Sequence, residues 1–479
     1  MRRPLAVVLA LCCLLSPGVA AAALPAGSGD SAPAASAPPD DLRPVPAAER
    51  NLAPGPGLRV DAGSQTEDCP DAPGIVCVPN TTNHLAPDRS NVVRTSFNDS
   101  SIDVSAALSA DSAGTTERLR ARTLRAAYER AGSDAERRAV VAAFADRLEN
   151  RSTALRERQR EALAAYNAGD ISDEQFLRTL ARLAVAADRL ERTLGTLGRY
   201  RDQSGAPVDD ARLGELYTDA AALDGPVRDR LAAVYTGARP PTRVFVETSG
   251  DGIVLAAVVG DGAGRTFLRE AHLLDARRTD STDQYGGNPT RVVDRASVLY
   301  PWAFETRGPT QINIETRPFG AAGTYRIVKY HPHGRLTTFL DGGTDRVFAE
   351  YQRKQVDRLP TATTVKTNES AGLTMTVRRS YEGGPLNVTV ADAETGQPVD
   401  AAVRVNNRSL GTTGGDGSLW TVMPRSVIVT VTVEYEGRTV TLSWTLNERA
   451  DVAAPAALGP AAPPTSLPPA DRAGPRGKV

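Results

Sequence analysis

Residues 172–197, SDEQFLRTLARLAVAADRLERTLGTL, decide the fold of the first half of the chain. Apolar side chains recur there at alternating steps of four and three residues, which places them in one seam along one side of a helix. Ser172 with Gln175 three residues later is the pattern of a capping box, so we expect the helix to begin at this point. The seam consists of Phe176, Leu180, Leu183, Ala187, Leu190, Leu194 and Leu197.

A second helix is expected immediately upstream, where a thinner apolar stripe runs from Val141 to Tyr166. Asn167, Gly169 and Asp170 provide a short turn between the two helices, and a short connection favours antiparallel neighbours. Residues 134–200 therefore predict a helical hairpin with coiled-coil-like spacing, within a helical region of residues 115–236. The heptad spacing also permits self-association through this hairpin.

After Pro240 and Pro241 the apolar period changes from that of helices to that of strands. Strands are expected at 243–248 and 252–259, then a helix at 291–303, three strands at 310–316, 324–330 and 336–340, and a helix at 346–358. This order predicts a small central α+β module.

Beyond Pro360 six short apolar or alternating runs are separated by Gly-rich turns, which is typical of an immunoglobulin-like β-sandwich. The runs are residues 373–378, 386–391, 401–405, 418–422, 427–435 and 438–446. We therefore expect a multidomain α+β protein. Its expected parts are a signal peptide (1–23), a disordered Ala/Pro/Ser/Gly-rich segment (24–57), a disulfide-containing cap with the helical domain (58–239), the α+β module (240–359), the β-sandwich (360–449) and a disordered Pro/Ala-rich tail (450–479).

The composition narrows the classes of partner. The chain has 479 residues with 56 basic and 57 acidic side chains, so it has no net field that would attract nucleic acid. Only 5% of the residues are aromatic, so the cores must be largely aliphatic.

The first residues have the pattern of a secretory signal peptide. Arg2 and Arg3 precede an apolar stretch at 5–15 that is too short to span a bilayer, and small residues at 20–23 offer cleavage sites. No other window approaches the length of a transmembrane helix. We expect an extracellular or cell-surface protein, exported by the Sec or the twin-arginine route and without a transmembrane segment in the mature chain.

Cysteine and asparagine patterns agree with export. Cleavage would leave Cys69 and Cys77, which in an oxidising compartment most simply form one disulfide. Six Asn-x-Ser/Thr sequons are candidate glycosylation sites. They are Asn80, Asn98, Asn150, Asn368, Asn387 and Asn407.

No catalytic or cofactor-binding motif is present: the chain lacks G-x-S-x-G, H-E-x-x-H and Walker patterns. His331 and His333 could ligate a metal from one face of a strand, but Pro332 and Gly334 favour an exposed turn. Three aspartates in Gly-rich turns, Asp341, Asp345 and Asp416, lack the spacing of a calcium loop. Glu270 and Asp275 have no identifiable base or nucleophile beside them.

Two resemblances add to this picture. NTTNHLAPDRSNVVRTSFNDSSIDVSAAL, AYNAGDISDEQFLRTLARL, FLREAHLLD, RASVLYPWAFE and YRIVKYHPHGRLTTFLDGG resemble uncharacterised exported proteins of haloarchaea. PLNVTVADAETGQPVDAAVRVNNRSLGTTGGDGSLWTVMP resembles the carboxypeptidase-regulatory or transthyretin-like β-sandwich. The first resemblance implies an archaeal envelope protein, and the second implies a surface or secreted module that carries no catalysis.

The expected function is that of an exported, non-catalytic envelope or secreted protein that acts as an interaction, adhesion or scaffold module, with no cofactor. The alternative is an inhibitor or modulator of an extracellular hydrolase, because residues 320–358 resemble small propeptide-like modules in their expected order of strands and helix.

Overall fold

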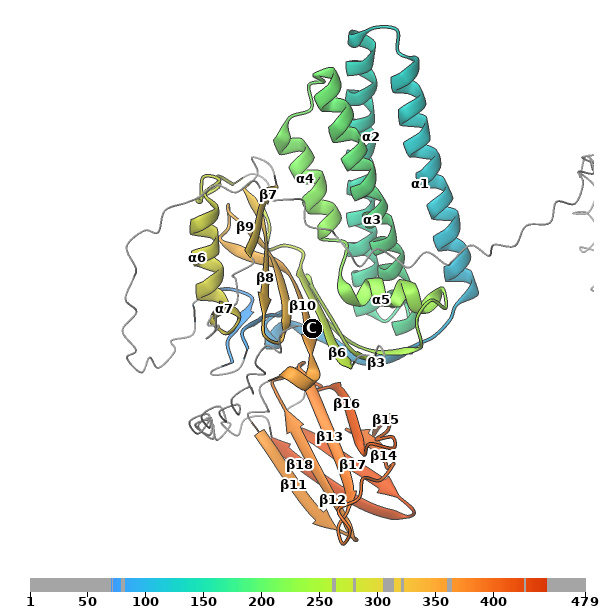
Figure 1. Cartoon of the computed structure of the whole chain (residues 1–479), viewed down its shortest axis with the longest axis vertical. Helices are drawn as coiled ribbons and strands as arrows, with labels where there is room; N and C mark the ends of the chain where they lie inside the picture. Colours follow the sequence, from blue (N-terminus) through green and yellow to red (C-terminus); the bar gives the residue numbers. More distant parts are fainter. Residues whose placement is uncertain are drawn as a thin grey trace, which may run out of the picture. The chain divides into compact units, whose positions relative to one another are not determined.

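The structure is a computed structural model that describes residues 70, 72–78, 82–260, 264–278, 281–304, 314–319, 323–359, 364–425 and 428–445. The expected signal peptide, the segment 24–57 and the tail 450–479 lie outside these residues. The described chain is multidomain α+β, as predicted, with helices in the first half and β-sheets in the second. Figure 1 shows these elements along the chain.

The described part of the first half contains five α-helices, of which α2 and α3 are the predicted hairpin (Figure 1). The Ser133 hydroxyl caps α2 by accepting from Glu136 N, and Gly169 ends that helix with a left-handed φ of 85°. The predicted capping box of Ser172 and Gln175 starts α3. The helices are α1 (Val104–Arg130), α2 (Asp134–Ala168), α3 (Asp173–Ser204), α4 (Asp210–Ala221) and α5 (Pro226–Tyr235).

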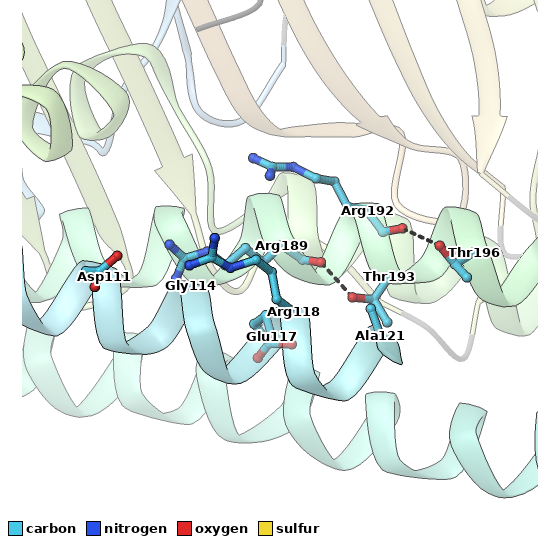
Figure 2. Close-up of a pocket in the computed structure, with 9 residues that line it drawn as sticks. All are labelled: Asp111, Gly114, Glu117, Arg118, Ala121, Arg189, Arg192, Thr193 and Thr196. Atoms are coloured by element: carbon cyan, nitrogen blue, oxygen red, sulfur yellow. Dashed lines mark hydrogen bonds between the residues drawn. The ribbon is translucent and has the colours of Figure 1, made fainter. Parts of the chain in front are cut away.

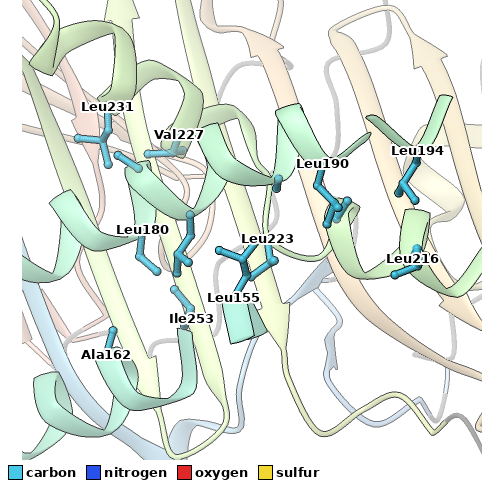
Figure 3. Close-up of a cluster of buried hydrophobic side chains, with 14 of the residues drawn as sticks. Leu155, Ala162, Leu180, Leu190, Leu194, Leu216, Leu223, Val227, Leu231 and Ile253 are labelled. Carbon is cyan, nitrogen blue, oxygen red and sulfur yellow. The ribbon is translucent and has the colours of Figure 1, made fainter. Parts of the chain in front are cut away.

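Every residue of the predicted seam is buried. The seam packs within the chain against α2, α4, α5 and one face of a β-sheet, as Figure 3 shows for Leu180, Leu190 and Leu194. Because these side chains already have intramolecular partners, the seam is not a free surface for pairing with a second copy.

One antiparallel sheet of eight strands connects the helices to the rest of the molecule. Its order is β3-β4-β5-β6-β10-β9-β8-β7. The strands are β3 (Val92–Ser100), β4 (Thr242–Ser249), β5 (Gly252–Gly260), β6 (Arg265–Leu273), β7 (Ile314–Phe319), β8 (Thr324–His331), β9 (Gly334–Asp341) and β10 (Arg346–Gln355). Strand β3 precedes all five helices yet pairs with β4, so the sheet is not built from residues 240–359 alone.

The two faces of the sheet carry different elements. Ile253 and Leu268 contribute to the core beneath helices α2 to α5. Val254 and Ala271 lie one and three residues further along the same strands and contribute to a second cluster with Leu85 and Val292 on the opposite face, as the two-residue period of strands requires. That cluster includes the hairpin β1 (Ile75–Val76) and β2 (His84–Leu85) and the helices α6 (Pro289–Leu299) and α7 (Pro301–Phe304).

One prediction for this region was wrong, and one strand was missed. The expected helix at 346–358 is strand β10 followed by the short 3-10 helix η2 (Val356–Arg358). Strand β6, in the interior of the sheet, was not predicted at all. The expected helix at 291–303 is confirmed as α6 and α7.

The β-sandwich consists of two four-stranded antiparallel sheets, with orders β11-β12-β13-β16 and β15-β14-β17-β18. Alternate side chains of both sheets, such as Val388 and Val431, form its aliphatic core. The strands are β11 (Thr364–Ser370), β12 (Leu373–Arg379), β13 (Pro385–Asp392), β14 (Ala402–Val405), β15 (Arg408–Thr412), β16 (Ser418–Val422), β17 (Ile428–Tyr435) and β18 (Arg438–Thr445). The six predicted strands are confirmed as β12 to β14 and β16 to β18.

Candidate functional site

An ion pair inside the large sheet holds the β1–β2 hairpin. Arg269 of β6 donates to Glu350 of β10 at 2.8 Å, and the two side chains are 2% and 0% exposed. The second carboxylate oxygen of Glu350 accepts from Leu85 N at 2.6 Å, and the guanidinium of Arg269 donates to Leu85 O. Since β2 makes no ladder bonds with the large sheet, this pair satisfies both polar groups of the Leu85 backbone.

A second buried ion pair joins the other face of β6 to the helices. Arg228 of α5 lies 2.8 Å from Glu270, and both side chains are fully buried. The Glu270 carboxylate also accepts from the backbone nitrogens of Val227 and Arg228 in the first turn of α5. Burial raises the pKa of Glu270, but the adjacent His272 ring and the charge of Arg228 outweigh it and hold the pKa below its usual range.

Gly225, directly before α5, makes this approach possible. A Cβ atom at position 225 would lie 2.1 Å from Glu270 Oε2, well inside contact distance. The glycine is therefore required by the carboxylate that caps the helix.

A buried lysine lies near the Arg269–Glu350 pair. Lys354 of β10 is 2% exposed, and its ammonium lies 4.0 Å from the centre of the Trp302 ring and 3.4 Å from Thr82 Oγ1. Burial lowers the pKa of Lys354 to about 7, although the charge of Glu350 opposes the shift. The ammonium of Lys354 thus contacts an aromatic ring and a hydroxyl group instead of a carboxylate.

The sandwich contacts the large sheet through a mixed interface. Arg425, which follows β16, binds Glu247 of β4 at 2.6 Å, and Glu247 is 1% exposed. Around this pair Phe97, Phe245 and Val422 belong to one apolar cluster. The buried pair and the apolar contacts together fix the sandwich to this part of the sheet.

A groove of about 420 Å³ lies between α1 and α3. Figure 2 shows Arg189 of α3 reaching α1 beside Gly114, while Arg192 points away. The Arg189 guanidinium donates to Ala110 O at 2.9 Å, and a Cβ at position 114 would lie 2.8 Å from its Nη2 atom. Asp111 and Glu117 also line the groove, so its charge is mixed and does not select anions or cations.

The outer face of α1 exposes large apolar side chains. Val104, Leu108 and Leu119 are 70%, 67% and 64% exposed, and Ile102 just before the helix is 67% exposed. On a helix the first three lie within about 60° of one another, so they form one stripe. We call these four residues the α1 apolar face.

Three models of known protein families match successive parts of the chain. Residues 1–240 match the model of a domain of unknown function, DUF7096, which is half of the chain. The chain belongs to the DUF7096 family. Residues 244–360 match a family of unknown function, DUF7094, and residues 364–442 match an archaeal fibronectin-III type-like domain. No curated protein is found to match the chain.

These matches refine the two resemblances. The sandwich of this DUF7096 protein is similar to the archaeal fibronectin-III type, whereas its sequence also resembles the carboxypeptidase-regulatory type. Both are β-sandwiches, and the archaeal match agrees with the archaeal character of the first resemblance.

The predicted modification sites fall in different environments. Cys77 follows β1, but Cys69 lies outside the described residues, so the Cys69–Cys77 disulfide stays a prediction. The sequon residue Asn80 also lies outside the described residues. Asn150 and Asn407 are exposed, and Asn98 and Asn368 are half-buried. Asn387 is 3% exposed and its amide donates to Ser418 Oγ at 2.9 Å, so a glycan there would require that bond to open.

The histidine and aspartate candidates lie at turns. The expected exposed turn is wrong for His331, which ends β8, is 9% exposed and packs its ring against Trp302. His333 lies half-buried in the β8–β9 turn, and the two ring centres are 5.9 Å apart. The Asp341 carboxylate accepts from Thr344 N, Asp345 pairs with Arg295, and Asp416 pairs with Arg265. Asp275 is exposed after β6.

Within the described ranges, no group of three or more His, Cys, Asp or Glu side chains is placed to hold a metal ion. In the same ranges, no helix has the length and apolarity to span a membrane.

The sequence reasoning did not identify Arg228, Arg269, Glu350 or Lys354 as important. Each is a charged residue in an amphipathic-looking stretch and would ordinarily be assigned to solvent. Their partners lie 42 residues away for the Arg228–Glu270 pair and 81 residues away for the Arg269–Glu350 pair, so no local pattern reveals the pairing.

Proposed function

We propose that this DUF7096 protein is an exported, non-catalytic surface protein of an archaeon, and that it acts by binding a partner protein. Export is supported by the signal-peptide pattern at the N-terminus. A haloarchaeal source is supported by the resemblance of residues 79–358 to exported proteins of that group.

The α1 apolar face is the observation that carries the binding role. Exposed single apolar residues are ordinary on protein surfaces, but a stripe on one helix is typical of an interaction site. Among the residues of α1, Ala106 and Leu124 are buried, so the helix presents most of its surface outward. The buried arginines and glutamates described above pair with one another across elements. This pairing supports a structural role for these charges rather than a catalytic one.

The alternative of a hydrolase inhibitor receives no such support. It rested on an order of strands and helix in residues 320–358, and the expected helix there is strand β10 within the sheet.

Site-specific photocrosslinking in living cells of the native host tests the binding role. A photoreactive phenylalanine analogue at Leu108 should give a discrete adduct of higher mass. The same analogue at Arg138, an exposed position on α2, should give none. An adduct of twice the chain mass would identify the partner as a second copy. Absence of any adduct at position 108, or equal labelling at both positions, would contradict the proposal.

A further inference from the structure

A pocket of about 450 Å³ opens between α2, α4 and the end of β6, away from the α1 apolar face. Its volume lies within the range of small-molecule sites. Its apolar lining includes Leu223, Leu274 and Phe348. Its charged lining includes four arginines, namely Arg156, Arg160, Arg277 and Arg278.

Two of the four arginines are already neutralised. Asp219 of α4 lies 3.3 Å from Arg156 and 3.0 Å from Arg277, and it also accepts from Ser152 Oγ. Arg277 additionally pairs with Glu215. These contacts hold the guanidinium groups of Arg156 and Arg277 in the wall of the pocket. The carboxylates of Asp219 and Glu215 offset two of the four positive charges of the arginines.

The other two arginines leave the pocket positively charged. Arg160 and Arg278 are exposed, and in the part of the chain that the structure describes neither guanidinium has a hydrogen bond or an ion pair. The net charge of the lining arginines with Asp219 and Glu215 is therefore about +2 at neutral pH.

A buried histidine without a hydrogen-bond partner also lines the pocket. His272 of β6 is 1% exposed, and neither ring nitrogen makes a hydrogen bond to another described residue. Its Nε2 atom lies 3.7 Å from Glu270 Oε1, beyond hydrogen-bond distance. Buried polar groups nearly always have a partner, so this imidazole has hydrogen-bonding capacity that a ligand in the pocket can use. Burial lowers the pKa of His272 to about 4, so at neutral pH it is an uncharged ring that can donate one N–H.

We propose that this pocket binds a small organic anion, whose phosphate, sulfate or carboxylate group is held by Arg160 and Arg278 with a hydrogen bond from His272. Guanidinium groups suit such oxyanions because they donate two parallel hydrogen bonds. The apolar wall of Leu223, Leu274 and Phe348 would contact the organic part of the ligand. This site is independent of the proposed partner surface.

Calorimetric titration of the full chain with phenyl phosphate, phenyl sulfate, benzoate and inorganic phosphate tests the proposal. At least one aryl anion should bind, more tightly than inorganic phosphate does, and the tightest of the three identifies the anionic group. The variant Arg160→Gln/Arg278→Gln should bind that ligand at least tenfold more weakly. Neither replaced side chain holds an ion pair, so the thermal unfolding temperature should not change.

The matched control is Arg138→Gln/Arg182→Gln, which removes the same charge from exposed positions on α2 and α3 and should bind as the wild type does. In the wild-type chain, ligand should also shift the ring nitrogen resonances of His272, which needs no variant. No binding of any aryl anion, equal binding by the pocket variant, or unchanged His272 resonances would overturn the site. Equal affinity for inorganic phosphate would overturn the role of the apolar wall.

Discussion

Arg269 and Glu350 form an ion pair of 2.8 Å across β6 and β10, and together they bind both backbone polar groups of Leu85. The pair takes the place of a neighbouring strand for the β1–β2 hairpin. This role in binding the hairpin accounts for one of the buried ion pairs in the molecule.

Glu350→Gln should lower the free energy of unfolding by about 3–5 kcal/mol, because it leaves the Arg269 charge buried and unpaired. Urea denaturation followed by circular dichroism measures the change. Glu129→Gln is the control, since it breaks the exposed pair Arg125–Glu129, whose side chains are 69% and 57% exposed. It should change the free energy of unfolding far less than Glu350→Gln does, because water screens an exposed pair.

The double variant Arg269→Met/Glu350→Leu tests whether stability depends on the ion pair itself or on the hydrogen bonds that the pair makes to the Leu85 backbone. Replacing a buried ion pair by apolar residues is often neutral. Here we expect the double variant to remain destabilised, because the N–H and C=O of Leu85 lose their partners. Recovery of wild-type stability would show that the hairpin does not depend on this pair.

Gly225→Ala should destabilise the chain by about 1–3 kcal/mol through overpacking. The new methyl group would displace the Glu270 carboxylate from the first turn of α5. Gly250→Ala, at a turn where a Cβ would meet no atom within 4 Å, is the matched control and should have little effect. Equal unfolding temperatures for the two variants would contradict the described contact.

Lys354→Met should stabilise the chain at pH 6 by about 1–3 kcal/mol, since it removes a charge that burial disfavours. The pKa of Lys354 is about 7 in the folded chain, below the ordinary value of a lysine. Between pH 7 and the ordinary lysine pKa, Lys354 is therefore protonated in the unfolded chain and neutral in the folded chain. Because the unfolded state binds more protons in this range, the free energy of unfolding of the wild type rises with pH. The advantage of the variant should shrink as the pH rises from 7 to about 10. A pH-independent advantage would mean that the ammonium is not desolvated.

The sequence was informative where one face of an element meets solvent. The α2–α3 hairpin, the Ser172 capping box and six strands of the sandwich follow from periodicity and turn residues, because their polar side chains do lie outward. These are local signals, and the structure agrees with each of them.

The prediction failed where polar residues are buried. In β10, Glu350, Gln352 and Lys354 occupy alternate, buried positions, which hid the period of a strand and left a pattern that resembles a helix. In β6 the adjacent charges of Arg269 and Glu270 point to opposite faces and are paired on both. Partners so far apart in sequence become visible only in three dimensions. The arginine pocket was missed for the same reason, since α2 and the segment after β6 meet only in the folded chain.

Intact mass spectrometry of the protein recovered from the culture medium, envelope and cytoplasm of the native host tests the central claim most directly. An exported surface protein should be found outside the cytoplasm without about the first 23 residues. It should also be two hydrogens lighter for a Cys69–Cys77 disulfide, and heavier by glycan at accessible sequons such as Asn150 or Asn407. A full-length, reduced and unmodified chain confined to the cytoplasm would contradict export, and with it the proposed role at the cell surface.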